Sequence, residues 1–329
     1  MDTLLPMEAR QVDALPDGNG WQFEPKWDGF RCLVFVAGGQ VELVSKSGKP
    51  LARYFPEVAE GLAQLPDAAL DGELIIPIDG ALSFDALQLR LHPAASRIRK
   101  LAGATPARLM LFDWLLEPAR PLAERRTRLE AFVDGHRGDW LRLSPATTVR
   151  QTAERWLARA GGALDGVVCK RLDEPYQPGE RAMLKVKHLR TADCVVGGYR
   201  LSQSGEEVAS LLLGLHDADD KLHHVGHAAG LAVLDKRVLK AQLEALAGPS
   251  FDGDAPGGPS RWRREENVWY SVRPELVAEV RYDHVSGGRF RHGTSFLRWR
   301  PDKHPRACRV DQLTPPSAPP VVAQALAGT

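Results

Sequence analysis

The sequence predicts an α+β fold organised in two parts. Up to about residue 188, strand-like apolar runs mix with amphipathic helical segments, which is the pattern of an α+β domain. Beyond that point the pattern changes to short strands with a single inserted helix, which suggests a small β-barrel. With 329 residues, 43% of them hydrophobic, the chain is long enough to bury two medium-sized cores.

The first part is expected to begin with a β-hairpin and a short helix. The apolar runs RCLVFV and QVELVS are separated by a glycine-containing turn, as in a hairpin. A helix should begin at Pro56, because proline suits the first helical position and Val58 and Leu62 then share one face. Further strands are expected at LDGELIIP and ARLMLFDWLL, further helices at LAERRTRLEAFV and TVRQTAERWLARAGG, and a strand pair at DGVVCKR and AMLKVKH.

The second part is expected to hold five strands and one helix. The strands are CVVGGYRL, ASLLLGLHD, KLHHVGHA, LVAEVRYDHV and SFLRWR, and the helix is VLDKRVLKAQLEALAG. The boundary is placed where the basic KVKHLR gives way to the apolar CVVGGY. We therefore expect domains at residues 1–189 and 190–313, and the proline-rich residues 314–329 are expected to form an extended tail outside the fold.

Composition narrows the functional classes. The 43 Lys and Arg residues nearly balance the 42 Asp and Glu residues, so the net charge of the whole chain does not indicate nucleic-acid binding. No apolar run approaches the roughly 18 residues of a membrane span, and no secretory signal is readable, so we expect a cytoplasmic protein with no membrane contact. The four cysteines lie far apart without a CxxC pair, which argues against a zinc site and a disulfide framework.

One basic stretch stands out from this balance. Residues 261–311 contain twelve Lys and Arg against seven Asp and Glu, with aromatic residues among them. Such a stretch can follow a phosphate backbone, but it is equally consistent with a solvated strand face whose aromatics pack in the core. The histidine cluster His223, His224 and His227 can be interpreted as a metal site, yet no fourth ligand is evident and the segment reads as a strand.

The segment EPKWDGFR, from Glu24 to Arg31, places Lys26 just before Asp-Gly and an apolar strand. Neither GxxxxGK[ST] nor GxGxxG occurs, so a nucleotide site would have to be built in another way. A lysine amine attacks only when it is deprotonated, and neighbouring cations such as Lys185 and Lys187 favour the neutral amine. Taken alone, the motif is more often a surface lysine before a turn.

Six further motifs follow in order: SKSG, LDGEL, FDW, DGVV, LKVK and RWRPDK. Together with EPKWDGFR, this series resembles the nucleotidyltransferase motifs of ATP-dependent DNA ligases. The segments FEPKWDGFR, LAERRTRLE, LDGVVCK and FLRWRPDK are most similar to the small bacterial ligases, the stand-alone ligase C and the ligase domain of ligase D. The resemblance covers about residues 20–310 and implies a nucleotidyltransferase (adenylation) domain followed by an OB-fold domain.

The resemblance implies an enzyme that seals 5′-phosphate/3′-hydroxyl nicks in duplex DNA during repair. Lys26 would attack the α-phosphorus of ATP and become lysyl-AMP, the AMP would move to the DNA 5′-phosphate, and the 3′-hydroxyl would displace it. ATP and Mg²⁺ or Mn²⁺ are the implied cofactors. Implied partners are nicked DNA and a repair polymerase or end-binding protein, with the ligase itself a monomer.

The resemblance also implies roles for single residues. Glu73 would hold the ribose or the metal, and Asp165 would be a metal ligand, with a shorter reach than the glutamate common at that place. Lys46 stands where the family usually has arginine, so its contact is less defined. The remaining implied roles are Lys185 and Lys187 at the α-phosphate, Phe112 and Val168 on either face of adenine, Glu24 near the base, Arg31 at the ribose and later the nick phosphate, Arg298, Arg300 and Lys303 at the departing pyrophosphate, and Arg289 and Arg291 on DNA.

Two alternatives stay open. An RNA ligase or a GTP-using capping-type nucleotidyltransferase shares the lysine motif and would differ in nucleotide and end preference. A catalytically silent nucleic-acid-binding module with the same two-domain shape would bind DNA in a salt-dependent way without any covalent nucleotide. The intact set of Lys26, Glu73, Lys185 and Lys187 weighs against the silent module.

Overall fold

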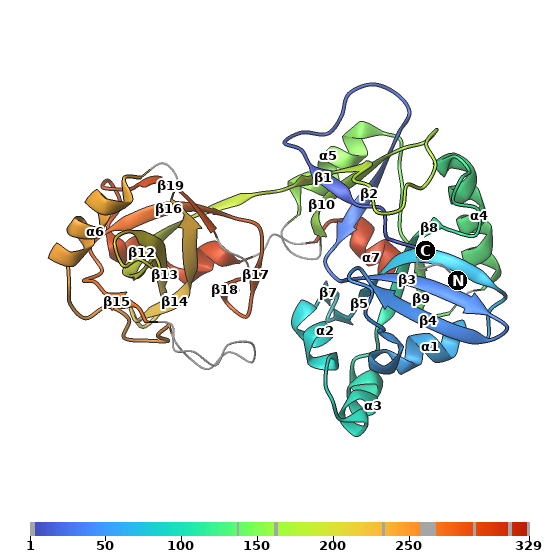
Figure 1. Cartoon of the computed structure of the whole chain (residues 1–329), viewed down its shortest axis with the longest axis horizontal. Helices are drawn as coiled ribbons and strands as arrows, with labels where there is room; N and C mark the ends of the chain where they lie inside the picture. The colour runs from blue at the N-terminus through green and yellow to red at the C-terminus, as the bar shows by residue number, and fades with distance from the viewer. Residues whose placement is uncertain are drawn as a thin grey trace. The chain divides into compact units, whose positions relative to one another are not determined.

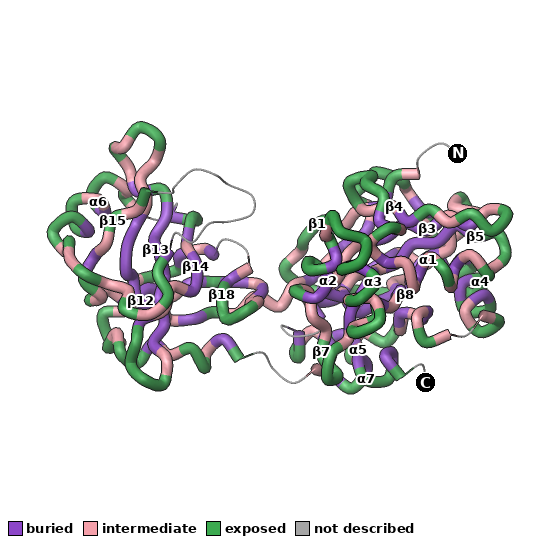
Figure 2. Tube along the Cα trace, turned by 90° about the horizontal axis from the view of Figure 1, so that it is seen from below, coloured by how far each residue is buried: buried purple, intermediate pink, exposed green. Residues whose placement is uncertain are grey.

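The chain folds into two compact units. The computed structural model describes residues 4–136, 138–160, 164–231, 234–256, 268–291, 294–314 and 318–327. Unit 1 comprises Met1–His188 together with Pro316–Thr329, and unit 2 comprises Leu189–Pro315. Each unit has its own helices and strands (Figure 1) and its own buried core (Figure 2).

Unit 1 contains two main sheets. The first has the strand order β1–β11–β10–β2, with β1 at Ala9–Gln11, β2 at Trp21–Trp27, β10 at Leu164–Arg171 and β11 at Met183–Lys187. The second has the order β4–β3–β5–β8–β9, with β3 at Phe30–Ala37, β4 at Gln40–Ser45, β5 at Ala68–Ile75, β8 at Arg108–Trp114 and β9 at Leu141–Leu143. The short strands β6 (Pro77–Ile78) and β7 (Ala81–Leu82) form a hairpin after β5.

The helices of unit 1 surround these sheets. They are the 3₁₀ turn η1 (Ala52–Tyr54), α1 (Pro56–Leu62), α2 (Phe84–Arg90), α3 (Ala95–Ala104), α4 (Leu122–Gly135), α5 (Arg150–Ala158) and α7 (Pro320–Ala327). Helix α4 packs on β8 and β9, and α5 packs on β2 and β10 (Figure 1). Helices α2 and α3 form an excursion between β7 and β8 that was not anticipated from the sequence pattern.

The expected hairpin and first helix are confirmed. Strands β3 and β4 pair antiparallel from Cys32↔Ser45 to Ala37↔Gln40, and α1 begins with Pro56 in its first turn. Alternation along β3 buries Val34 and Val36 in the core. The expected helix TVRQTAERWLARAGG is seen as α5, and its last two residues, Gly161 and Gly162, lie outside the described residues.

The expectation of an extended C-terminal tail is wrong for residues 320–327, which form α7 within unit 1. Val322 is fully buried, and α7 packs into the core that contains Phe23 and Trp156. The carbonyl oxygen of Leu326 accepts hydrogen bonds from Arg108 Nη1 at 2.6 Å and from Arg142 Nε at 3.2 Å. Apolar burial and this capping of the helix end outweigh the extended preference of the prolines before it.

Unit 2 is a small closed β-barrel. Among the described strands, β12 (Arg190–Leu201), β13 (Val208–His216), β14 (Leu222–Gly230), β19 (Thr294–Trp299) and β16 (Val277–Tyr282) pair in a ring, because β12 bonds to both β13 and β16. The ring includes a parallel β14–β19 pair. Around it lie β15 (Tyr270–Ser271), the hairpin β17 (Val285–Ser286) and β18 (Arg289–Phe290), α6 (Lys236–Ala245), and the 3₁₀ turns η2 (Pro305–Ala307) and η3 (Val310–Leu313).

Part of the basic, aromatic stretch between residues 261 and 311 lies outside the described residues, namely 261–267 and 292–293. Within the described part, Tyr282, Phe290 and Phe296 are buried in the barrel core, as the solvated-face interpretation requires of its aromatics. No helix in the described segments is long and apolar enough to cross a membrane.

A charged residue on the buried face of α7 tests how much this helix contributes to the stability of unit 1. Val322→Asp should lower the free energy of unfolding by roughly 3 kcal/mol or more, because it buries an unpaired carboxylate. Thermal and urea unfolding would measure the change. Gln324→Asp, on the exposed side of the same helix, is the matched control, and equal unfolding midpoints for the two variants would contradict the packing.

Candidate active site

Two rows of side chains cross the first sheet of unit 1 on one face. Strand β10 lies between β2 and β11, and its Gly166 is in register with Lys26 on one side and Lys187 on the other. Two residues further along β10, Val168 is in register with Glu24 and Lys185. Because side chains alternate along a strand, both rows face the same way.

Glycine is required at the centre of the first row. Gly166 has φ of +145°, and a Cβ built there would lie 2.0 Å from the carbonyl oxygen of Val186. The register of β10 against β2 also shifts between Leu164 and Gly166. This bulge brings the side chain of Asp165 next to the lysines of the first row.

Asp165 contacts two of the lysines of the candidate site directly. Its Oδ2 lies 2.7 Å from Lys26 Nζ and 3.2 Å from Lys187 Nζ. Burial alone would raise the pKa of Asp165, but the two ammonium groups outweigh it and hold the pKa below the usual value. The carboxylate therefore stays ionised and neutralises part of the charge of the paired lysines.

Lys185 adds a third cation to this face. Partial burial, with Lys26 and Lys187 nearby, lowers the pKa of Lys185. Together with Lys170 on β10, four lysines share this sheet face with two carboxylates, Asp165 and Glu24, which leaves an excess of positive charge. Such a place attracts a phosphate group.

Glu73 and Arg31 lie opposite one another on β5 and β3. Burial raises the pKa of Glu73 to about 7, although the charges of Lys26 and Arg31 oppose this shift. Glu73 thus belongs to the same electrostatic cluster as Lys26. A carboxyl group with a perturbed pKa beside a candidate nucleophile is typical of a functional site.

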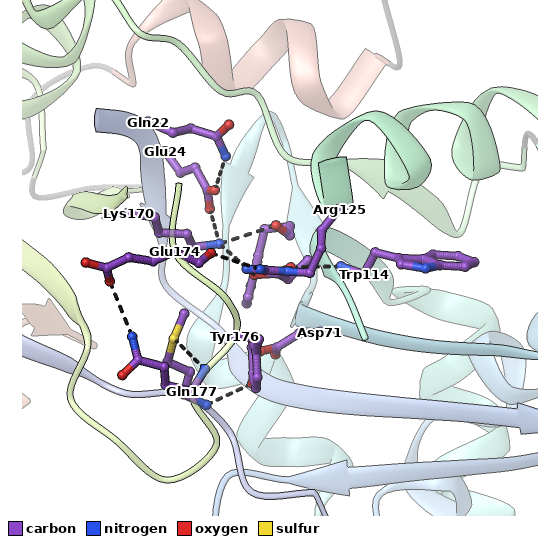
Figure 3. A network of polar contacts seen from close by, with 12 residues as sticks. Gln22, Glu24, Asp71, Trp114, Arg125, Lys170, Glu174, Tyr176 and Gln177 are labelled. Carbon is purple, nitrogen blue, oxygen red and sulfur yellow. Dashed lines mark hydrogen bonds and ion pairs between the residues drawn. The ribbon is translucent and has the colours of Figure 1, made fainter. Parts of the chain in front are cut away.

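Arg31 is held by a buried network whose members Asp71 and Tyr176 are labelled in Figure 3. Asp71, with no exposed surface, accepts hydrogen bonds from Arg31 Nε at 2.6 Å and Nη2 at 2.5 Å. The hydroxyl of Tyr176 donates to Asp71 Oδ2 at 2.8 Å and accepts from the backbone NH of Met7 at 2.8 Å. The bidentate pair and the tyrosine restrict the guanidinium to one orientation.

A second buried network surrounds Glu24 (Figure 3). Lys170 Nζ lies 2.9 Å from Glu24 Oε2, and Gln22 Nε2 donates to Glu24 Oε1 at 2.7 Å. Lys170 also lies over the ring of Phe112 at 4.7 Å from its centroid, and the guanidinium of Arg31 lies 4.8 Å from it. Glu24 and Phe112 thereby share Lys170 as a neighbour.

Arg125 extends this network away from the sheet face. Its Nε donates to Asp113 Oδ1 at 2.8 Å, and both side chains are 1% exposed. Asp113 Oδ2 also lies 3.7 Å from Lys170 Nζ. The charged helix segment LAERRTRLE thus supplies a buried cation that supports the strands carrying Phe112 and Lys170.

Lys46 lies at the edge of the cluster and is 60% exposed. Its Nζ is 3.1 Å from Glu8 Oε1, and Arg181 Nε is 3.7 Å from Glu8 Oε2. The hydrogen bond from Lys46 is the largest cause of the lowered pKa of Glu8. Glu8, in the N-terminal segment, therefore neutralises the charge of Lys46, the lysine of SKSG.

The expected residues of unit 2 form a separate set. Arg298 Nε donates to Glu279 Oε2 at 2.6 Å. Arg300 Nη1 and Lys303 Nζ each lie 2.8 Å from a carboxylate oxygen of Asp193. Hydrogen bonding from Arg300 lowers the pKa of Asp302 to about 2.

The other expected residues of unit 2 lie on β14 and β18. Arg289 is 49% exposed, with its Nη2 at 3.9 Å from Asp254 Oδ2, and Arg291 follows the end of β18. Burial, helped by Arg289, lowers the pKa of His224 to about 4. His223 Nε2 lies 2.8 Å from Asp217 Oδ2, and burial also lowers the pKa of His227, so the three histidines of the cluster lie in different surroundings.

No group of three or more His, Cys, Asp or Glu residues in the described parts of the chain is placed to hold a metal by itself. Glu73 and Asp165 nevertheless offer two carboxylates beside Lys26. Mg²⁺ typically binds one or two carboxylates and completes its coordination with substrate phosphates and water. This donor set fits such an ion.

The structure therefore brings most of the expected residues of unit 1 together. Lys26, Glu73, Asp165, Lys185 and Lys187 are electrostatically coupled in one cluster. Lys170 was overlooked, although strand alternation places it on the same face as Val168. The other overlooked residues are Glu8, Asp71, Tyr176 and Asp193, whose partners are distant in the sequence.

Comparisons with known proteins give consistent matches. Residues 6–187 match the family model described as the ATP dependent DNA ligase domain, and residues 204–303 match that of the ATP dependent DNA ligase C terminal region. The chain is 46% identical to DNA ligase C2 of Mycolicibacterium smegmatis over 94% of each chain. It is 44% identical to DNA ligase C of Mycobacterium tuberculosis over 96% of this chain and 95% of that protein.

A solved structure shows the same fold at low sequence identity. The structure from a study of DNA binding with a minimal scaffold in Lig E DNA ligases is 16% identical, with a TM-score of 0.55. The match covers 89% of this chain and 100% of that chain. The expected pairing of a nucleotidyltransferase domain with an OB-fold domain is thereby confirmed.

Removing one hydroxyl tests the network behind Arg31. Tyr176→Phe should lower the free energy of unfolding by about 1–3 kcal/mol, because it takes one hydrogen bond from buried Asp71 and one from Met7. Urea unfolding would measure the difference. Tyr270→Phe, at a residue that is 44% exposed, is the control, and an equal effect of both changes would contradict the network.

Proposed function

The chain belongs to the family of ATP-dependent DNA ligases, and from this premise we propose that it seals 5′-phosphate/3′-hydroxyl nicks in duplex DNA through a covalent lysyl-AMP. The observation that carries the proposal is the position of Lys26. Its amine lies 2.7 Å from Asp165 and shares that carboxylate with Lys187 on a sheet face where lysines outnumber carboxylates. A candidate nucleophile, a carboxylate that would orient it and candidate phosphate-binding cations are thus adjacent.

In the first proposed step, Lys26 Nζ attacks the α-phosphorus of ATP. A bond forms between nitrogen and phosphorus while the bond from phosphorus to the bridging oxygen breaks, and pyrophosphate leaves. The attacking amine is neutral, and the proton that its nitrogen releases on forming the bond passes to water, while Asp165 Oδ2, 2.7 Å away, would orient the amine. Lys185 and Lys187 would stabilise the charge that develops on the phosphate oxygens.

In the later proposed steps the AMP passes to a DNA 5′-phosphate and is then displaced by the neighbouring 3′-hydroxyl. Asp71 holds Arg31 in one orientation through Nε and Nη2, and Nη1, which takes no part in these bonds, is proposed to contact the ribose or the nick phosphate. Lys46 would contribute charge at the edge of the same site. Glu24 is proposed to lie near the adenine, with Phe112 and Val168 on its two faces.

Mg²⁺ is the proposed metal, and Mn²⁺ could replace it. Glu73 and Asp165 would hold it, and when bound it would neutralise charge on the phosphates. Ionised Glu73 is the form that suits this role. Glu73 is also proposed to contact the ribose.

We propose a separate role in the reaction for each of the two units. Residues 1–189, completed by α7, are proposed as the adenylation domain, and residues 190–313 as the OB-fold domain. Arg298, Arg300 and Lys303 of the latter would orient the departing pyrophosphate. We further propose that the enzyme acts as a monomer in cytoplasmic DNA repair, where a repair polymerase or an end-binding protein would supply or hold its nicked DNA.

Intact-protein mass separates this proposal from its alternatives. Incubation with ATP and Mg²⁺ should add one AMP, and GTP should add no nucleotide. Any AMP already attached is first removed with pyrophosphate. A gain from GTP would favour a capping-type enzyme, preference for RNA ends would favour an RNA ligase, and no gain from either nucleotide would favour a silent binding module.

Lys26→Ala should abolish the mass gain, because the variant has no amine at the position of attack. Sealing of a nick that already carries AMP should be reduced much less, since that substrate bypasses the first step. A gel assay would compare the sealing of an ordinary nick with that of the pre-adenylated nick. Lys100→Ala, at an exposed lysine, is the control. Equal loss on both substrates would count against Lys26 as the adenylated residue.

Arg289 and Arg291 are proposed to contact the DNA backbone. Changing both to Ala should weaken nick binding and lower the slope of log affinity against log salt by about one to two. Binding titrations at several salt concentrations would measure the slope. The control removes the same charge from the exposed Arg97 and Arg99 of α3, and an unchanged slope in the Arg289/Arg291 variant would disprove the contact.

A further inference from the structure

The cations of the segment RWRPDK are already paired with acids of their own unit. Arg300 Nη1 lies 2.8 and 3.0 Å from the two oxygens of Asp193, and its Nε and Nη2 donate to Asp302. Lys303 Nζ lies 2.8 Å from Asp193 Oδ2. Each nitrogen of the Arg300 guanidinium therefore donates to a carboxylate.

Asp193 is held rigidly in this position. It lies on β12 in register with Glu279 of β16, which is itself in register with Arg298 of β19. The backbone NH of Asp193 donates to Gln312 Oε1 at 3.0 Å, and Gln312 Nε2 donates to the carbonyl oxygen of Asp193 at 3.2 Å. The carboxylate is thus presented from a fixed strand, with a side chain that is 12% exposed.

Two acids directly opposite each other across a strand pair are unfavourable unless cations neutralise them. Here Arg298 pairs with Glu279, whereas Arg300 and Lys303 share Asp193. These ion pairs therefore belong to the folded barrel surface. The side chain of Arg300 is 20% exposed and that of Lys303 is 26% exposed, so solvent screens these pairs less than it screens a fully exposed pair.

We propose that Asp193 is a positioning residue that occupies Arg300 and Lys303 as an internal counter-ion, and that the triphosphate of ATP must displace it. This inference rests on the proposed function, which assigns these cations to the departing pyrophosphate. Arg300 Nη1 and Lys303 Nζ both donate to Asp193, so a phosphate that binds these two cations together has to compete with that carboxylate for them. Asp193 therefore competes with ATP during lysyl-AMP formation.

Asp193 also acts after pyrophosphate has left the site. Once pyrophosphate has left, Asp193 recaptures Arg300 and Lys303, and the affinity of these cations for phosphate falls. Asp193 thus separates the first step of the reaction from the later steps on DNA. Sealing of a nick that already carries AMP does not use the pyrophosphate contact, so it should not depend on Asp193.

The test compares Asp193→Asn with wild type in the full chain. Single-turnover lysyl-AMP formation is measured across ATP concentrations, together with sealing of a pre-adenylated nick. The ATP concentration that gives the half-maximal rate should fall by roughly threefold to tenfold, since a competing anion is removed. The rate at saturating ATP and the rate of pre-adenylated sealing should stay at the wild-type values.

Asp220→Asn is the matched control. Asp220 pairs with Arg309 at 2.6 Å in the same unit, so this change removes the same charge and also breaks an ion pair. It should leave the ATP dependence unchanged. Asp193→Ser is made in parallel, and thermal unfolding identifies which of the two Asp193 variants keeps the wild-type fold.

The proposal is overturned if a folded Asp193 variant forms lysyl-AMP more slowly than wild type at low ATP, or if its rate depends on ATP concentration as the wild-type rate does. It is also overturned if Asp220→Asn lowers the half-maximal ATP concentration as much as Asp193→Asn does. If both Asp193 variants fail to fold, Asp193 is a structural residue and the proposal is also overturned. Failure of the wild-type protein to form lysyl-AMP would instead refute the proposed function.

Discussion

Positive charge is concentrated on one face of the first sheet of unit 1, and this crowding is the constraint around which the rest of the candidate site is arranged. Lys26, Lys185 and Lys187 come from two strands that flank β10, and their mutual repulsion is reduced by Asp165. The bulge before Gly166 allows the carboxylate to reach them. Without an acid at that point, three ammonium groups could not share so small a surface at low cost.

An acid also lies beside other cations that are proposed to bind phosphate. Arg31 is held by Asp71, Lys46 by Glu8, and Arg300 by Asp193. These acids differ in burial, and their effects should differ accordingly. Asp71 is fully buried and fixes an orientation, whereas Glu8 is partly exposed and holds a cation that is itself mostly in solvent.

The sequence predicts those features whose signals are local. Local spacing and turn residues predict the hairpin of β3 and β4, the start of α1 at Pro56 and the strand pair of β10 and β11, which runs from Leu164 to Lys187. The candidate site could be predicted because its motifs resemble a known family. The positions of Asp71, Tyr176 and Asp193 could not, because their contacts join residues 40, 105 and 107 positions apart. Helix α7 was missed because prolines surround a short apolar segment whose burial depends on a distant core.

Helix α7 also has a consequence for the order in which the protein folds. It follows unit 2 in the chain, yet it completes the core around Phe23 and Trp156 in unit 1. During synthesis on the ribosome, the barrel therefore emerges before unit 1 has its last helix. The first unit to be made would be the last to be finished, and its apolar surface beneath α7 would stay uncovered until translation has passed the barrel.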